Sequence, residues 1–345
     1  MGKKRKATYF GFMPKSEHVI GGGEVKTKTV LKALEESNKF ERIIAVDTSN
    51  WKNNIMSLAF KLLIGMIKTK YIIIVQSTSA FLSILPMLNI MSKLFKNEIH
   101  FIPVGNCLIS NFDKISKIKQ INKIKGVYVQ SESIKTKLDT IGVRSVHVMH
   151  NFKYINSYLV PYQSEFPLKF VYLSRISEEK GIFECLDVFK KINHNSKKGK
   201  CVLDIYGIVD EKIAVQFEEI VNNSDIFSYR GIIKPEESST IIRKYFMLVF
   251  PTKYDGEGFP GTVIDAFAGG IPLLVSRFSN FKDMLNDHVD CISFEFNNYE
   301  DMYDKLLYCI DHTEEINAMR IHSHHKYSRY TPEREINILL NNMDV

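Results

Sequence analysis

The chain has 345 residues, of which 45% are hydrophobic and 25% are charged, and its formal net charge is +7. This composition is that of a globular protein and excludes a disordered or fibrous chain. The length is too great for one ordinary core and predicts two α/β domains of about 150 residues each. Five scattered cysteines without a C-x-x-C pair predict reduced core residues and exclude a disulfide framework.

The ends and the apolar stretches of the chain predict a cytoplasmic protein. The basic run Lys3–Lys6 leads directly into a strand-like segment, so no secretory signal is visible. Gly2 lacks the usual myristoylation pattern, because position 6 is lysine. The longest apolar region, 80–95, is shorter than the roughly 20 residues that a membrane span needs.

Positive charge is concentrated in the first half. Residues 1–165 hold 25 Lys and Arg against 11 Asp and Glu, whereas residues 166–345 hold 21 against 28. The first half is therefore expected to face an anionic partner. No nucleic-acid-binding motif is present and few aromatic residues lie among the lysines, so nucleic acid is not expected. An anionic membrane surface is the better fit, with the protein peripheral on the inner face of the cell membrane.

Segment 111–125 predicts a basic amphipathic helix with isoleucine at spacings of three. We expect the isoleucines to point inward and the lysines to face lipid headgroups, although a core-packing helix with solvated lysines remains an alternative. The lysines are Lys114, Lys117, Lys119, Lys123 and Lys125, and the isoleucines are Ile115, Ile118, Ile121 and Ile124. The predicted helices at 51–68 and after Ser79 are unusually apolar.

The first half alternates apolar runs with amphipathic stretches, which predicts βαβ units and a parallel sheet. The strands are expected near 7–12, 42–47, 71–75, 98–104, 126–130 and 145–149. After the first of them, Gly21-Gly22-Gly23 leads into a helix whose N-terminus offers free N–H groups to an anion. Segment 153–167, which contains Pro161 and Pro167, is predicted to be a linker before a second α/β series.

The second half contains a strand, a glycine-rich turn, a short helix and another strand over residues 246–275. Three glycines and a proline between Asp255 and Thr262 leave backbone N–H groups able to hold phosphate. Two carboxylates, Glu257 and Asp265, frame this turn eight positions apart, too far to serve one atom. They suit an elongated anion with hydroxyl groups at both ends, such as a nucleoside diphosphate sugar. The alternative is that Glu257 caps a helix and Asp265 is a surface charge.

Two cations precede this turn in the chain. Arg175 and Lys180 flank a short loop between a strand and a helix, so both can turn toward one anion. Two other functions remain open at this point. Gly256, Gly258 and Gly261 spell G-x-G-x-x-G, which would suit an NADP-dependent oxidoreductase using Arg277. The basic first half would also suit a membrane-binding scaffold without catalysis.

The turn resembles the donor-binding signature of retaining glycosyltransferases of family 4. The match consists of Glu257-Gly258-Phe259-Pro260, then Asp265, then Gly269-Gly270-Ile271-Pro272. Arg175 and Lys180-Gly181, the first glycine loop, Ser131 and Asn151 also correspond to positions of that family. The second acid is usually glutamate, and Lys153 and Tyr154 stand where an acid often follows the asparagine.

The resemblance implies the glycosyltransferase B fold, an α/β fold with two Rossmann-like domains facing across a cleft. Domain 1–152 would bind the acceptor, domain 168–330 would bind a nucleotide sugar, with UDP favoured, and helix 331–345 would cross back to the first domain. The acceptor would be a glycan or lipid-linked, in bacterial envelope polysaccharide synthesis. No cofactor is implied, and no metal, because the chain has no D-x-D triplet. The implied donor-binding residues are Gly22, Gly23, Gly231, Ile232, Gly258, Phe259, Pro260, Gly261, Thr262, Val263 and Asp265.

The resemblance also implies roles for three catalytic residues. Arg175, Lys180 and backbone N–H groups would stabilise the departing diphosphate. We favour a front-face transfer in which Glu257 holds a hydroxyl of the donor sugar and Asp265 holds the ribose; a double displacement with Glu257 as nucleophile is the alternative. No catalytic histidine is assigned. We interpret His100, His147 and His150 as structural and His322, His324 and His325 as surface residues.

Overall fold

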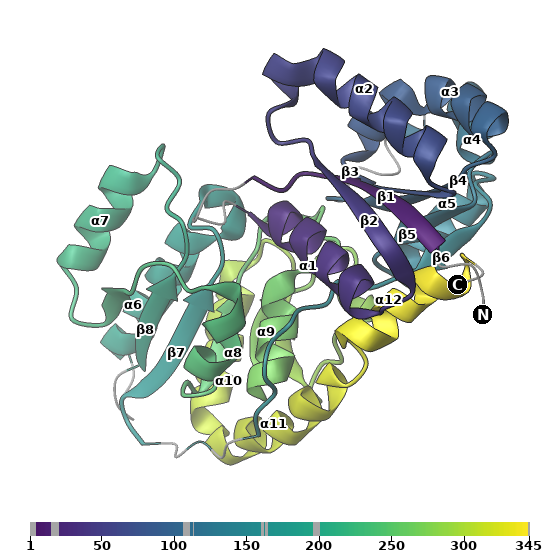
Figure 1. Cartoon of the computed structure of the whole chain (residues 1–345). Coiled ribbons are helices and arrows are strands. Elements are labelled where there is room, and N and C mark those ends of the chain that lie inside the picture. The colour runs from purple at the N-terminus through teal and green to yellow at the C-terminus, as the bar shows by residue number, and fades with distance from the viewer. Residues whose placement is uncertain are drawn as a thin grey trace. The chain divides into compact units, whose positions relative to one another are not determined.

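The chain forms two compact units, each built on one parallel sheet (Figure 1). The computed structural model describes residues 5–14, 21–105, 111–112, 114–159, 162, 165–195 and 201–343. The first unit comprises Met1–Phe152 and Tyr330–Val345, and the second comprises Lys153–Arg329. Some residues singled out in the sequence lie outside the described residues, namely Gly2, Lys3, Lys4, Cys107 and Pro161.

The first unit contains a six-stranded sheet in the order β2-β1-β3-β4-β5-β6, in which every neighbouring pair is parallel. Its strands are β1 (Arg5–Gly11), β2 (Phe40–Asp47), β3 (Tyr71–Gln76), β4 (Glu98–Pro103), β5 (Gly126–Val129) and β6 (Val146–Val148). Its helices are α1 (Gly22–Glu36), α2 (Trp51–Lys68), α3 (Thr78–Phe95), α4 (Ile115–Ile121), α5 (Glu132–Thr140) and α12 (Pro332–Asn341).

The period-two alternation of the strands divides the core of the first unit between the two faces of its sheet. Phe10, Ile72 and Ile74 pack in one cluster with side chains of α2, α3 and α5. Tyr9 points to the other face, where its hydroxyl donates to the Thr27 carbonyl of α1 at 2.6 Å. The C-terminal helix α12 packs against α1 and belongs to this unit.

The second unit contains a six-stranded parallel sheet in the order β12-β11-β10-β7-β8-β9. Its strands are β7 (Leu168–Leu173), β8 (Cys201–Tyr206), β9 (Phe227–Tyr229), β10 (Met247–Phe250), β11 (Leu273–Ser276) and β12 (Cys291–Phe294). Its helices are α6 (Ile182–Asn195), α7 (Ala214–Asn222), α8 (Ser238–Ile242), α9 (Gly261–Gly269), α10 (Tyr299–Asp311) and α11 (Thr313–Tyr327). Short 3-10 turns cover Glu178–Lys180, Pro235–Glu237 and Phe281–Asp283.

The neighbouring strands β7, β10 and β11 bring their carboxyl ends to one edge of the second sheet. In parallel sheets this edge is where loops gather to bind ligands. The described part of segment 153–167 has no helix or strand, yet it is hydrogen-bonded to the second unit. The Tyr158 N–H donates to the Ala268 carbonyl at 2.7 Å, and the Tyr327 hydroxyl donates to the Ile155 carbonyl at 2.9 Å.

The helix predicted over 111–125 is shorter than expected. It runs only from Ile115 to Ile121. Ile121 and Ile124 are buried as predicted, but Ile115 is 73% exposed. Ile115 occupies the first helical position, where no described element covers it, so the prediction that all four isoleucines point inward was wrong.

Among the described residues, one helix, α3, is long and apolar enough to cross a membrane by length and composition alone. Its side chains Phe81, Leu85 and Leu88 are buried in the core of the first unit. The described cysteines, Cys185, Cys201, Cys291 and Cys309, are buried and free of disulfide bonds.

Candidate active site

Two loops meet at the carboxyl edge of the second sheet. The first follows β7 and contains the turn Glu178–Lys180, and the second follows β10 and leads into α9. Gly181 has a φ of +69°, and a Cβ at this position would lie 2.1 Å from the Pro251 carbonyl oxygen. Only glycine permits this approach. The Lys253 N–H then donates to the Glu179 carbonyl at 2.8 Å, which joins the two loops.

The structure brings Lys180 and Glu257 together in a buried ion pair. Only 8% of Glu257 is exposed, and its Oε1 atom accepts from Lys180 Nζ and from the Thr252 hydroxyl, the latter at 2.8 Å. Lys180 Nζ also lies 5.5 Å from the ring centroid of Tyr254 and 5.9 Å from that of Phe250. Thr252 and Lys180 therefore orient the carboxylate, and two aromatic rings lie close to the ammonium group of the pair.

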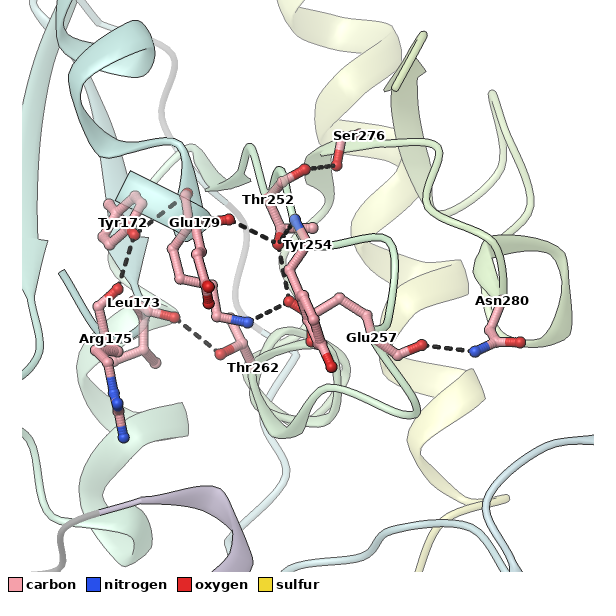
Figure 2. A network of polar contacts seen from close by, with 11 residues as sticks. Tyr172, Leu173, Arg175, Glu179, Thr252, Tyr254, Glu257, Thr262, Ser276 and Asn280 are labelled. Carbon is pink, nitrogen blue, oxygen red and sulfur yellow. Dashed lines mark hydrogen bonds and ion pairs between the residues drawn. The ribbon is translucent and has the colours of Figure 1, made fainter. Parts of the chain in front are cut away.

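The turn that carries Glu257 is fixed by side chains from the next loop. The Asn280 amide donates to the Glu257 carbonyl at 2.6 Å, and the Ser276 hydroxyl donates to the Thr252 carbonyl at 2.8 Å (Figure 2). The Ser279 N–H donates to Asp255 at 2.8 Å. The sequence prediction missed Thr252 and Asn280, because a threonine after a strand and an asparagine 23 positions from the glutamate carry no local signal.

Arg175 lies at the end of β7 without an ionic partner. The buried Tyr172 hydroxyl donates to the Arg175 carbonyl at 3.0 Å and so fixes the backbone of this loop. The Arg175 side chain is exposed and turns away from the Glu257 network (Figure 2). No hydrogen bond or ion pair joins its guanidinium group to any residue that the structure describes. This planar cation is available to an external anion.

The N-terminus of α9 offers backbone donors. Pro260 is its N-cap and no side chain caps the helix, so the N–H groups of Gly261 and Thr262 have no partner within the described chain. The Thr262 hydroxyl donates to the Leu173 carbonyl at 2.8 Å and ties the helix to β7. The unpaired N–H groups and the helix dipole together suit a phosphate. Phe259 and Val263 are buried, so they could contact a ligand only through their backbone.

Asp265 is not a surface charge. It is 2% exposed, and its two oxygens accept from Lys153 Nζ at 2.6 Å and from the Ser238 hydroxyl at 2.7 Å. Lys153 Nζ also lies 3.3 Å from the position that a Cβ on Gly261 would take. The lysine is therefore a further cation beside the start of α9. The sequence indicated this residue in one way, because Lys153 stands where the family often has an acid after the asparagine.

The other predicted site residues take no part in the hydrogen bonds given above. Gly231 has a φ of +81° and accepts from the Gly207 N–H at 2.9 Å, whereas Ile232 is 60% exposed. Gly22 and Gly23 begin α1 in the first unit, where the Gly21 N-cap provides no side-chain hydrogen bond. A Cβ on Gly23 would lie 2.7 Å from Val104 Cγ1. The described residues contain no group of three His, Cys, Asp or Glu side chains arranged to hold a metal ion.

The histidines of the first unit have structural surroundings. His100 is fully buried, its Nδ1 lies 2.9 Å from the Tyr128 hydroxyl, and burial lowers its pKa to about 3. His150 pairs with Glu335 of α12 at 3.1 Å. Arg277, which an NADP enzyme would need, is ion-paired with Asp287 at 2.9 Å and with Glu295.

The sequence of residues 163–339, just over half of the chain, matches the family model of glycosyl transferases group 1. The chain belongs to this family. It is a glycosyltransferase of family 4 that takes a sugar from a nucleotide sugar, with retention, and neither the oxidoreductase nor the non-catalytic alternative stands. No curated protein has a sequence that matches the chain.

Solved structures share the fold of this glycosyltransferase over most or nearly all of its length. The lipopolysaccharide outer core galactosyltransferase WaaB matches with a TM-score of 0.68 at 15% identity, covering 98% of this chain and 99% of WaaB. HepE from Anabaena, in complex with UDP and glucose, matches with a TM-score of 0.71 at 11% identity, covering 99% of both chains. TarM from S. aureus, in complex with UDP, matches with a TM-score of 0.62 at 19% identity, covering 84% of this chain and 59% of TarM. The predicted glycosyltransferase B fold is confirmed.

Proposed function

We propose that this glycosyltransferase uses a UDP-sugar and extends a glycan or lipid-linked acceptor in bacterial envelope polysaccharide synthesis. UDP is favoured because HepE and TarM, which share the fold, were each solved with UDP. The envelope acceptor is supported by the likeness to WaaB, a lipopolysaccharide outer core enzyme. The protein would work at the inner face of the cell membrane, with the acceptor held by its basic first unit.

The observation that carries the proposal is the cluster at the start of α9. The unpaired N–H groups of Gly261 and Thr262 and the two cations Arg175 and Lys180 all come from the carboxyl edge of one sheet. A diphosphate bound there would meet positive charge from both side chains and backbone. The ammonium group of Lys180 would interact with both the diphosphate and Glu257.

The reaction that suits this arrangement is a front-face transfer. The bond between the anomeric carbon and the diphosphate oxygen breaks, and the acceptor oxygen bonds to the same face of that carbon. The departing phosphate oxygen takes the acceptor's proton, so no protein base is needed. Arg175, Lys180 and the N–H groups stabilise the negative charge that develops on the leaving group. Glu257, oriented by Thr252, accepts a hydrogen bond from a hydroxyl of the donor sugar.

The nucleoside end of the donor would be held by the group around Asp265. Because both oxygens of Asp265 already accept hydrogen bonds from Lys153 and Ser238, a ribose hydroxyl would join this group rather than meet a free carboxylate. Gly231 and Ile232 would line the space for the base. The exposed Ile232 side chain suits stacking against a flat ring.

A binding and hydrolysis screen tests the proposal. The intact protein is heated with UDP-glucose, UDP-galactose, UDP-N-acetylglucosamine or GDP-mannose, with NADPH as the control. A donor at about 100 times its Kd stabilises the fold by about 2.7 kcal/mol, which raises Tm by several degrees. We expect at least one UDP-sugar to raise Tm and to be hydrolysed slowly without acceptor. Stabilisation by GDP-mannose alone would overturn the choice of UDP.

A further inference from the structure

Helices α2 and α3 are apolar on two opposite faces. Their inner faces place Leu62 and Met66 of α2 and Leu85 and Leu88 of α3 in the core of the first unit. A helix that covers a sheet normally carries polar residues on its other face. On these two helices the outer face also carries a stripe of apolar residues.

The outer face of α3 displays Met87, Ile90 and Leu94, of which Ile90 is 74% and Leu94 is 73% exposed. These positions are three and four residues apart, so they form one stripe along the helix. Within the described part of the molecule nothing covers this stripe.

The outer face of α2 also carries apolar residues at helical spacing. Met56, Phe60 and Ile67 stand four and seven residues apart, and Met56 is 81% exposed. The helix is kinked at Asn54, and Trp51 and Ile55, on either side of the kink, are also exposed. Exposed apolar residues gathered in a patch mark a binding surface, whereas single ones do not.

The two stripes belong to one continuous surface. Helix α2 packs against α3, and α3 packs against α4, with the Asn89 amide of α3 donating to the Gln120 carbonyl at 3.0 Å. Figure 1 shows α2, α3 and α4 on one side of the β1–β6 sheet, with α1 and α12 on the other. Ile115, exposed at the start of α4, extends the surface. We call the outward residues of α2, α3 and α4 the apolar face.

The three helices that form the apolar face carry charge of one sign. The sequences of α2, α3 and α4 contain no Asp or Glu at all. The exposed lysines on or next to these helices are Lys61, Lys68, Lys93, Lys96, Lys114, Lys119 and Lys123. An apolar centre with a cationic rim complements a bilayer that contains anionic lipid. A protein partner would have to match the same combination with a large acidic surface around an apolar one.

We propose that the apolar face inserts into the headgroup region of an anionic membrane and holds the protein there as a monotopic enzyme. The helices lie in the plane of the membrane and do not cross it, because Phe81, Leu85 and Leu88 fasten α3 to the sheet. The segment 111–125, which the sequence singled out for its lysines, then forms the rim of the surface and not its centre.

Vesicle binding tests the inference, with Trp51 as the reporter, since it is the only tryptophan of the chain. The intact protein is mixed with phosphatidylcholine vesicles that do or do not contain phosphatidylglycerol. We expect binding to the anionic vesicles and a blue shift of the Trp51 fluorescence. Raising the salt to about 1 M, where the screening length is about 3 Å, should weaken binding about tenfold or more without abolishing it.

Paired variants separate the apolar contribution from the charge. Ile90→Ser with Leu94→Ser should lower vesicle affinity at least about tenfold and abolish the binding that survives high salt. The matched control is Val215→Ser with Ile321→Ser, two exposed apolar residues of the second unit that should leave binding unchanged. Lys61→Gln with Lys93→Gln should weaken binding to anionic vesicles only.

Four outcomes would overturn the inference. Binding that disappears completely at high salt, or that occurs without a Trp51 shift, would show that only charge is involved. Equal loss in the control variant would place the surface elsewhere. Self-association that Ile90→Ser with Leu94→Ser abolishes, without any vesicle binding, would assign the apolar face to a second copy of the chain.

Discussion

The turn 251–262 and the apolar face of α2, α3 and α4 violate the ordinary rules of burial in opposite directions. The turn holds the carboxylate of Glu257 at 8% exposure, where a charge is costly unless it is paired. The apolar face exposes Met56, Ile90 and Leu94, where a soluble protein would place polar groups. The turn holds a buried charge, and the apolar face holds exposed hydrophobic side chains.

The comparison of these two regions indicates where functional sites lie in a fold that many activities share. Most of the structure obeys local rules, and deviations that the rest of the fold sustains are expected at functional sites. The buried pair of Lys180 and Glu257 orients polar groups for chemistry. The apolar face, by contrast, needs no orientation, because the hydrophobic effect is not directional. The two regions should therefore respond differently to single substitutions, and four measurements test the polar side of this comparison.

The largest effect is expected at the two cations of the turn. Arg175→Ala and Lys180→Ala should each reduce turnover by about a hundredfold or more, since each removes a charge from the developing diphosphate. Lys180→Ala should also lower the free energy of unfolding by about 2 kcal/mol, because it leaves the buried Glu257 without its cation. Arg175→Ala should leave stability unchanged, since its side chain is exposed and has no partner among the described residues.

Steady-state kinetics and urea unfolding of both variants measure these effects. The exposed pair Lys191 and Glu300, at 2.5 Å in the same unit, gives a matched control, and Lys191→Ala should alter neither quantity much. Turnover close to that of the unmodified protein in either test variant would remove that cation from the site.

The second measurement asks whether Glu257 orients the donor or attacks it. We expect Glu257→Ala to lose about ten- to a hundredfold in rate, to gain nothing from added azide and to keep the retained product. The reason is that Oε1 of Glu257 already accepts from Lys180 and Thr252, which holds it as a hydrogen-bonding group. A nucleophile would instead be replaced by azide, giving a sugar azide of inverted configuration. Isolation of a glycosylated Glu257 would establish the double displacement.

The sequence predicts much of the site around Glu257 but few of the residues from other loops that hold the site in place. The alternation of strands and helices and the glycine-rich turn follow from local patterns, whereas the convergence of Arg175 and Lys180 on one anion stays a prediction. Asn280 and Ser238 come from other loops, and only the packed fold brings them to Glu257 and Asp265. The apolar character of α2 and α3 was visible in the sequence, but when two opposite faces of a helix are apolar, its period does not show which of them is exposed.

The third measurement concerns Asp265 and Lys153, whose side chains meet at 2.6 Å. A ribose contact is made equally in the ground and transition states, so Asp265→Ala should mainly raise the KM for the donor, by about tenfold. If the two residues act as one unit, Lys153→Ala should have a similar effect and the double variant should be little worse than either. Asp265→Asn, which keeps the shape but removes the charge, is the matched control for packing. A fall in turnover at saturating donor would show that the role is misassigned.

The smallest effect tests a third buried charge, that of Lys26, which has no carboxylate partner among the residues that the structure describes. Lys26 in α1 is 8% exposed, its Nζ donates to the Pro103 carbonyl at 3.0 Å, and burial lowers its pKa to about 7. Between that value and the ordinary lysine pKa of about 10.4 the unfolded chain binds more protons than the folded one, so stability rises with pH. From pH 7 to pH 8 the contribution of Lys26 should grow by about 1 kcal/mol. In Lys26→Met, which keeps the apolar stem and removes the charge, urea unfolding at the two pH values should lack this increment. An equal rise in the free energy of unfolding of the variant would show that Lys26 remains charged in the folded protein. The first unit would then tolerate a buried cation without a carboxylate partner, whereas the turn around Glu257 pairs its buried charge.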